Sequence, residues 1–145
     1  MAIGELDPVR AHEVLKSTPT ACYLDVRTEP EFRAGHATGA WNVPVFVRDP
    51  SGRMMPNPDF VAVVKKNFPA SSRLVVGCAT GVRSMRACDV LEAAGFAELV
   101  NLSSGFLGRI DESTGVPEPG WQGCGLPAES AGPTERTYEK LRAKA

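Results

Sequence analysis

Short apolar runs alternate along the chain with stretches in which apolar residues recur three or four positions apart. Runs of this kind are typical of buried strands, and they occupy residues 22–26, 73–77 and 98–102. Another strand is predicted to start within residues 39–45, where Pro44 breaks it. Residues 47–57, rich in proline and glycine, are predicted to form a loop.

Helical spacing and capping residues separate these strands. Asp7 and Pro8 are typical of an N-cap followed by a first-turn proline, and Thr28 with Glu31 forms a capping-box pattern. Gly95 is a C-terminal stop. Helices are therefore predicted over residues 8–17, 28–35, 58–68 and 83–94.

The alternation of strands and helices predicts an α/β fold. Because the strands are apolar on both faces, we expect a parallel sheet covered by helices on both sides. Ligands of such sheets bind beyond the carboxyl ends of the strands, and Cys78 directly follows the run at 73–77. Cys78 is therefore expected to lie where such a sheet binds its ligands, a position that suits a catalytic residue.

Composition agrees with one soluble domain. The chain has 145 residues, 43% of them hydrophobic and 23% charged, and a formal net charge of -1. Because the net charge is close to zero, no overall electrostatic attraction to nucleic acid or to an anionic membrane is expected. No apolar stretch reaches the length needed to span a bilayer. The N-terminus lacks the pattern of a signal peptide, so a cytoplasmic location is expected. We expect a single domain over residues 1–128 and a polar tail over 129–145, with a possible helix starting near 134.

The cysteines Cys22, Cys78, Cys88 and Cys124 match no zinc pattern. No bound metal is therefore expected. The thiols are expected to be reduced, because a domain of this size does not need disulfides. Cys88 lies on the apolar stripe of its helix and Cys22 begins a strand, so both are interpreted as packing residues. Cys124 lies in a Gly/Pro-rich loop that follows a short helical piece after Gly105, and a relay thiol is an alternative there.

The stretch that follows the strand at 73–77 can hold an anion. Consecutive backbone N–H groups can form a concave nest, and the start of a helix adds partial positive charge, so both would stabilise a thiolate at Cys78. Gly81 permits the turn, Arg83 can bind an oxyanion, and Ser84 can cap the helix or donate to the sulfur. Activity requires that this thiol ionises and that solvent reaches it. The candidate site residues are Cys78 as nucleophile and Ala79, Thr80, Gly81, Val82, Arg83 and Ser84 as substrate-binding residues.

Two chemistries use a cysteine in such a loop. Cysteine phosphatases carry C-x5-R, whereas Cys78 and Arg83 form C-x4-R, one residue shorter. A tighter ring favours a single extra sulfur atom on the cysteine over a phosphate, which indicates sulfur transfer through a persulfide. Phosphatase or arsenate reductase activity is the alternative that the shorter loop opposes.

The stretch "YLDVRTEPEFRAGHATGAWNVPV" followed by "CATGVRS" resembles the rhodaneses, the thiosulfate sulfurtransferase family, in their single-domain form. The later "SSGF" and "GLP" resemble the closing signature of the family. The resemblance implies a three-layer sandwich with a central five-stranded parallel sheet. It also implies Cys78 as nucleophile, residues 79–83 as the sulfur-binding loop, and no metal or organic cofactor.

The resemblance further implies a small anionic donor such as thiosulfate, and cyanide or a thiol as acceptor. A sulfur-carrier or sensing module that acts on a protein partner is the alternative. Arg83 is the one basic residue of the loop, which favours a persulfide or a mercapto acid over thiosulfate. We expect Arg27 to pair with Glu31, with substrate contact as the alternative, and His36 to bond a backbone carbonyl rather than act as a base.

Overall fold

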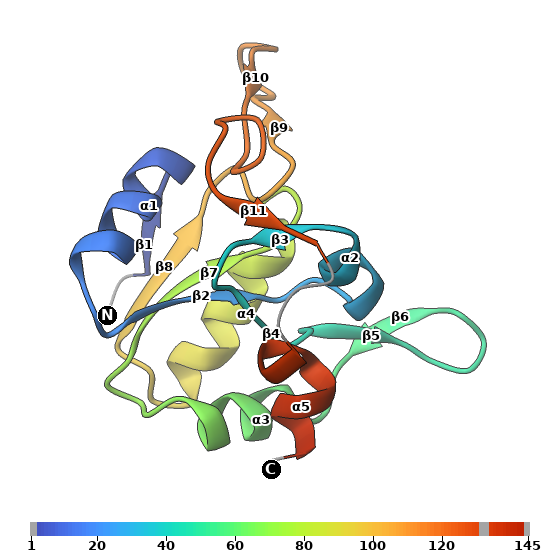
Figure 1. The fold of residues 1–145 in the computed structure, drawn as a ribbon. Coiled ribbons are helices and arrows are strands. Elements are labelled where there is room, and N and C mark those ends of the chain that lie inside the picture. Colours follow the sequence, from blue (N-terminus) through green and yellow to red (C-terminus); the bar gives the residue numbers. More distant parts are fainter. Residues whose placement is uncertain (1–2, 131–133, 144–145) are drawn as a thin grey trace.

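Five parallel strands form the centre of the part of the chain that the structure describes (Figure 1). The structure is a computed structural model that describes residues 3–130 and 134–143. The strand order is β1-β8-β7-β2-β4, and each neighbouring pair is parallel. The strands are β1 (Gly4–Leu6), β2 (Ala21–Asp25), β4 (Trp41–Asn42), β7 (Arg73–Gly77) and β8 (Glu98–Leu102). The predicted parallel sheet is confirmed, with β7 at its middle.

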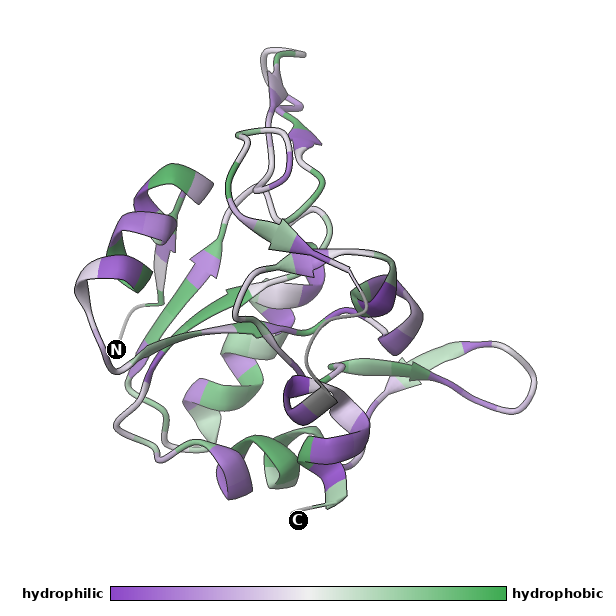
Figure 2. Ribbon diagram, in the orientation of Figure 1, coloured by the Kyte–Doolittle hydropathy of each residue, from purple (hydrophilic) through white to green (hydrophobic). Residues whose placement is uncertain are grey.

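Helices cover both faces of this sheet, as predicted. One core contains buried residues of α3, α4 and α5, and the other contains buried residues of α1 and α2. Side chains alternate along β7, so that Leu74 and Val76 face the first core and Val75 faces the second. Figure 2 shows apolar residues along the central strands. The helices are α1 (Pro8–Ser17), α2 (Glu29–Ala34), α3 (Phe60–Asn67), α4 (Val82–Ala93) and α5 (Tyr138–Ala143).

Local sequence patterns correctly predicted the bounds or capping residues of several of these elements. The bounds of β7 and β8 equal the two predicted apolar runs. Asp7 caps α1 by accepting the Arg10 N–H at 2.8 Å, and the Glu31 carboxylate accepts the Thr28 N–H at 3.1 Å in the capping box of α2. Strand β1 was not predicted, because its three residues are partly exposed and form no apolar run.

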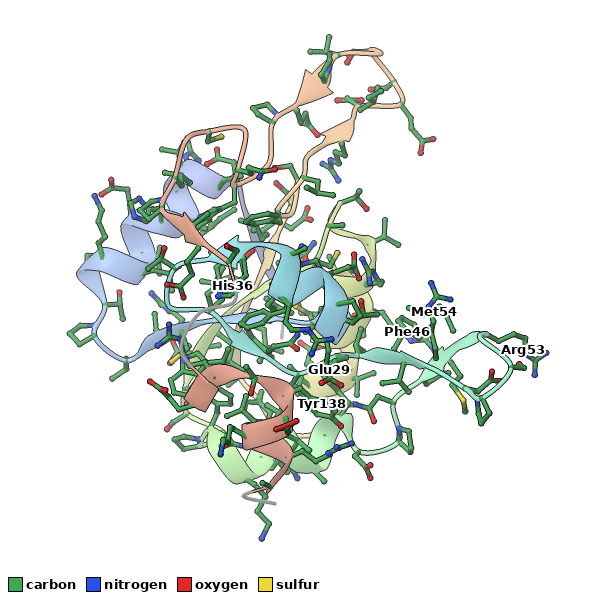
Figure 3. The ribbon with its side chains drawn as sticks, turned by 45° about the vertical axis from the view of Figure 1, so that its right-hand side comes forward. Glu29, His36, Phe46, Arg53, Met54 and Tyr138 are labelled. Atoms are coloured by element: carbon green, nitrogen blue, oxygen red, sulfur yellow. The ribbon has the colours of Figure 1, made fainter. Side chains whose placement is uncertain are left out.

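Two hairpins extend beyond the sandwich (Figures 1 and 3). The loop predicted at 47–57 is wrong in part, because β5 (Phe46–Arg48) pairs antiparallel with β6 (Met54–Pro56). Phe46 lies near the base of this hairpin and Arg53 near its tip (Figure 3). The second hairpin pairs β9 (Arg109–Ile110) with β10 (Pro117–Glu118). The short helical piece predicted after Gly105 is also wrong, because these residues form turns that lead into β9.

The C-terminal segment packs against the domain. Strand β11 (Ala128–Glu129) pairs with β3 (His36–Ala37), and a 3-10 turn (Thr134–Arg136) precedes α5. Tyr138 and Leu141 of α5 are buried in the core with α3 and α4. The segment expected as a polar tail therefore carries a helix that completes one face of the sandwich. Residues 131–133 and 144–145 of that segment lie outside the described residues.

Candidate functional site

Cys78 lies where the middle strand of the sheet meets the start of a helix. Strand β7 ends at Gly77, and α4 begins at Val82 with Gly81 as its N-cap. Gly81 has φ +99°, a left-handed conformation, and its N–H donates to the Cys78 sulfur at 3.0 Å. The sulfur thus accepts a backbone hydrogen bond at the electropositive end of a twelve-residue helix. Both features stabilise negative charge on sulfur.

A second segment, residues 103–107, forms backbone hydrogen bonds with this loop. The sequence had given these residues no role at the site. The N–H groups of Phe106 and Leu107 donate to the carbonyl oxygens of Cys78 and Ala79 at 2.7 and 2.9 Å. Because peptide N–H and C=O groups point in opposite directions, the next N–H groups of the loop face away from this support. Gly105 has φ +66°, and a Cβ there would lie 2.6 Å from the Cys78 carbonyl oxygen. The "SSGF" motif therefore holds the orientation of the loop peptides.

The loop covers the sulfur. Cys78 is 1% exposed, whereas Thr80 and Val82 are exposed on the outer side of the loop. A cavity of about 430 Å³ adjoins these two residues and is walled by the β9–β10 hairpin, with Ile110 among its lining residues. Cys78 is not among the residues that line this cavity, so its thiol becomes reachable from there only when the loop opens. Opening of the loop is therefore a requirement of any chemistry at this sulfur.

Arg83 is bound by a carboxylate from another element. Its two terminal nitrogens donate to the two oxygens of Glu31 at 2.8 and 2.9 Å, a fork-shaped ion pair. Hydrogen bonds from Arg83 are the largest influence on Glu31 and lower its pKa from 4.5 to about 2, although burial opposes them. The positive charge expected for an anionic substrate is thus already balanced in this conformation.

The predicted pairing of Arg27 with Glu31 is wrong. Arg27 instead pairs with Asp25, with Nη2 at 2.8 Å from Oδ2, and both residues are almost fully buried. Residues 25 and 27 are two apart at the end of β2, so their side chains share one face, whereas Glu31 turns toward Arg83. Arg27 also donates to the Gly35 carbonyl at 2.7 Å, which indicates a structural role.

Both histidines of the chain are engaged away from the loop thiol. The Nδ1 atom of His36 lies 2.6 Å from the Phe32 carbonyl oxygen, which confirms the predicted backbone bond. His12 packs edge-on against Trp121. Neither histidine is therefore placed to act as a general base for this thiol.

The other cysteines differ from Cys78 in their surroundings. Cys88 is fully buried in the core, as predicted, and burial raises the pKa of its thiol to about 12. Cys22 packs half-buried against the same core, and burial raises the pKa of its thiol as well. Cys124 is half-buried in the wall of a cavity of about 330 Å³, which it shares with Ser103. Cys22 and Cys88 are thus poor nucleophiles at neutral pH.

The Glu31–Arg83 pair predicts a loss of stability in acid. Because the folded protein lowers the pKa of Glu31 from 4.5 to about 2, its contribution is complete above pH 4.5 and disappears as the pH falls toward 2. The Glu31 side chain is 34% exposed, so solvent screening limits this contribution to roughly 1 kcal/mol. Denaturant unfolding of Glu31→Gln at several pH values should show a correspondingly flatter acid limb. Glu13→Gln, which removes an exposed carboxylate paired with Lys16, is the matched control; equal acid limbs in the two variants would contradict the assignment.

Comparison with known proteins agrees with this geometry. The rhodanese-like domain model matches residues 8–109. The chain belongs to the rhodanese family. The match includes the loop from Cys78 to Ser84 and ends in the β9–β10 hairpin.

Named relatives of this rhodanese include two sulfurtransferases of Arabidopsis thaliana. Thiosulfate sulfurtransferase 16, chloroplastic, is 46% identical over 84 residues, which cover 58% of this chain and 69% of the relative. Thiosulfate sulfurtransferase 18 is 39% identical over 93 residues, covering 63% and 68% of the two chains. The crystal structure of Rv0390 from M. tuberculosis is 28% identical, with a TM-score of 0.73 and coverage of 91% and 100%.

The location of the protein stays a prediction. Among the described residues, no helix is both long and apolar enough to cross a membrane. One of the relatives above is named as chloroplastic, so their names do not point to the cytoplasm.

Proposed function

We propose that this rhodanese is a sulfurtransferase that carries sulfane sulfur on Cys78 as a persulfide. The observation that carries the proposal is the 3.0 Å hydrogen bond from the Gly81 N–H to the Cys78 sulfur at the start of α4. An ionised sulfur in this place is stabilised without a histidine base. The names of the two sulfurtransferase relatives support the same reaction class.

The reaction divides into two displacement steps. In the first, the Cys78 thiolate attacks the outer sulfur of thiosulfate; the new S–S bond forms, the S–S bond of the donor breaks, and sulfite leaves with that bonding pair. In the second, cyanide or an acceptor thiolate attacks the outer sulfur of the persulfide, and Cys78 leaves as thiolate. No oxidant, metal or organic cofactor is needed for this balance.

The loop residues have separate roles in this proposal. The backbone of Ala79, Thr80 and Val82 would surround the outer sulfur once the loop opens, together with Gly81 and the first turn of α4. Arg83 would contact an anionic donor only by exchanging Glu31 for it. This competition favours donors with little charge near the sulfur over thiosulfate. Examples are a low-molecular-weight persulfide, from which a thiolate leaves, and a 3-mercapto-2-oxo acid, from which an enolate leaves with the C–S bonding pair.

A second candidate function is sulfur transfer to a protein thiol. Val82 and Ile110 are 75% and 64% exposed, and both line the cavity beside the loop. Apolar side chains at the rim of a site favour contact with another macromolecule. Fast transfer to a protein thiol with negligible turnover of cyanide and small thiols would establish this candidate over the first.

Peptide mapping of the native protein tests the proposal. After treatment with thiosulfate or glutathione persulfide, we expect one added sulfur atom on the peptide that carries Cys78, and faster loading by the persulfide. Cys22, Cys88 and Cys124 serve as internal controls that should stay unloaded. Failure of both donors to load Cys78, or failure of iodoacetamide to alkylate it in the native protein, would show that the loop does not open and would overturn the proposal. Release of phosphate from a phosphate ester would instead support the phosphatase alternative.

A further inference from the structure

A chain of hydrogen bonds leads from the Cys78 sulfur through the interior to the surface. The sulfur lies 3.4 Å from the Ser84 hydroxyl oxygen, which lies 2.5 Å from the side-chain oxygen of Asn101. The Asn101 amide nitrogen donates in turn to the Glu5 carboxylate at 3.1 Å. Cys78, Ser84 and Asn101 are all at least 98% buried, whereas Glu5 is exposed.

The orientation of the Asn101 amide follows from its neighbours. Parallel pairing places Glu5 of β1 beside Asn101 of β8, so their side chains share one face of the sheet. The second partner of the amide nitrogen is the Gly81 carbonyl oxygen, at 3.3 Å. A carboxylate and a carbonyl accept hydrogen bonds but do not donate them. The NH₂ group of Asn101 must therefore face these two groups, and its oxygen must face Ser84.

This orientation decides what Ser84 offers to the sulfur. The single hydroxyl proton of Ser84 is used in the bond to the Asn101 oxygen, so its lone pairs are left for Cys78. Ser84 then accepts from the thiol S–H, which is opposite to the donor role expected from the sequence. The sulfur thus lies between one donor, the Gly81 N–H, and one acceptor, Ser84.

We propose that Asn101 is a positioning residue that holds the Ser84 hydroxyl as an acceptor and thereby favours the protonated thiol of resting Cys78. When the thiol ionises, Ser84 can donate to the thiolate only by leaving the buried Asn101 oxygen without a partner, which is unfavourable. The inference rests on the proposed function in that Cys78 is taken as the reacting thiol. It adds that reactivity is restrained by a residue outside the loop.

Alkylation of Cys78 by iodoacetamide across a pH series tests this inference without requiring sulfur transfer. In Asn101→Leu the Ser84 proton is free to turn to the thiolate, so alkylation near neutral pH should be roughly three- to tenfold faster and the pH profile should move to lower pH. In a Ser84→Ala background the same substitution should have no effect. Cys88 is the internal control for folding, since it is fully buried and should stay unmodified.

A pair of surface variants keeps the test decisive if Asn101→Leu does not fold. Glu5→Ala removes one of the two acceptors that orient the amide, whereas Glu5→Gln removes the same charge but keeps a carbonyl acceptor. We expect faster alkylation in Glu5→Ala than in Glu5→Gln. An unchanged rate in Asn101→Leu, an acceleration that persists without Ser84, or equal rates in the two Glu5 variants would each overturn the inference. Persulfide loading of the wild-type protein is measured separately from alkylation. Failure of the proposed sulfur transfer can therefore be told apart from failure of the inference about Asn101.

Discussion

Cys78→Ser is expected to reduce persulfide formation to background with every donor. A serine hydroxyl is not ionised at neutral pH and cannot form the S–S bond on which the proposed transfer depends. The fold should survive, because the hydroxyl can accept from the Gly81 N–H and donate to Ser84 in place of the sulfur. Intact-protein mass after donor treatment, together with the circular dichroism of each variant, measures both effects.

Cys124→Ser is the matched control for this prediction. Cys124 is half-buried in a cavity wall that contains none of the loop residues 78–84. Its removal should leave both loading of Cys78 and release to an acceptor unchanged. Loading that persists in Cys78→Ser would reject the assigned nucleophile, and loss of release alone in Cys124→Ser would establish the relay thiol that the sequence left as an alternative.

Gly81→Ala is expected to lower both persulfide formation and stability. A side chain at φ +99° costs about 1–2 kcal/mol, and a Cβ here would lie well inside van der Waals contact with the Ser103 carbonyl oxygen. That oxygen belongs to the segment that supports the loop, so the loop must shift and the Gly81 N–H must leave the sulfur. We expect roughly a hundredfold slower loading, on the scale of a lost stabilising donor. Quenched time courses of persulfide loading measure the rate, and denaturant unfolding measures the stability.

Gly95→Ala separates backbone strain from the clash at the site. Gly95 follows the other end of α4 and has φ +103°, but nothing lies within 4 Å of an added Cβ. This variant should lose about 1–2 kcal/mol of stability and load sulfur at the wild-type rate. If Gly81→Ala loads as fast as Gly95→Ala, the position of the Gly81 N–H is not what activates the sulfur.

Local patterns predicted the parts of this protein that depend on neighbours in the chain. The apolar runs at β7 and β8 and the capping residues of α1 and α2 matched the structure because periodicity and capping act over a few residues. Cys78 could be singled out for the same reason, since a strand end, a glycine and a helix start follow one another directly. The β5–β6 hairpin was missed because its two strands have only three residues each and carry no apolar alternation.

Tertiary structure decided which groups surround the sulfur. Arg83 meets Glu31 across 52 residues because α4 and α2 follow the neighbouring strands β7 and β2. Asn101 meets Glu5 across 96 residues because β8 pairs with β1. Sequence spacing cannot show that Ser84 accepts a hydrogen bond from the thiol. This depends on the Ser84 hydroxyl proton being donated to Asn101, which lies on β8. The covering of the sulfur likewise depends on Gly105 and Phe106, which pack under the loop only in the folded sheet. The sequence by itself thus predicted a candidate nucleophile at the start of a helix, whereas the charge, hydrogen-bond direction and access of the site follow from contacts that exist only after folding.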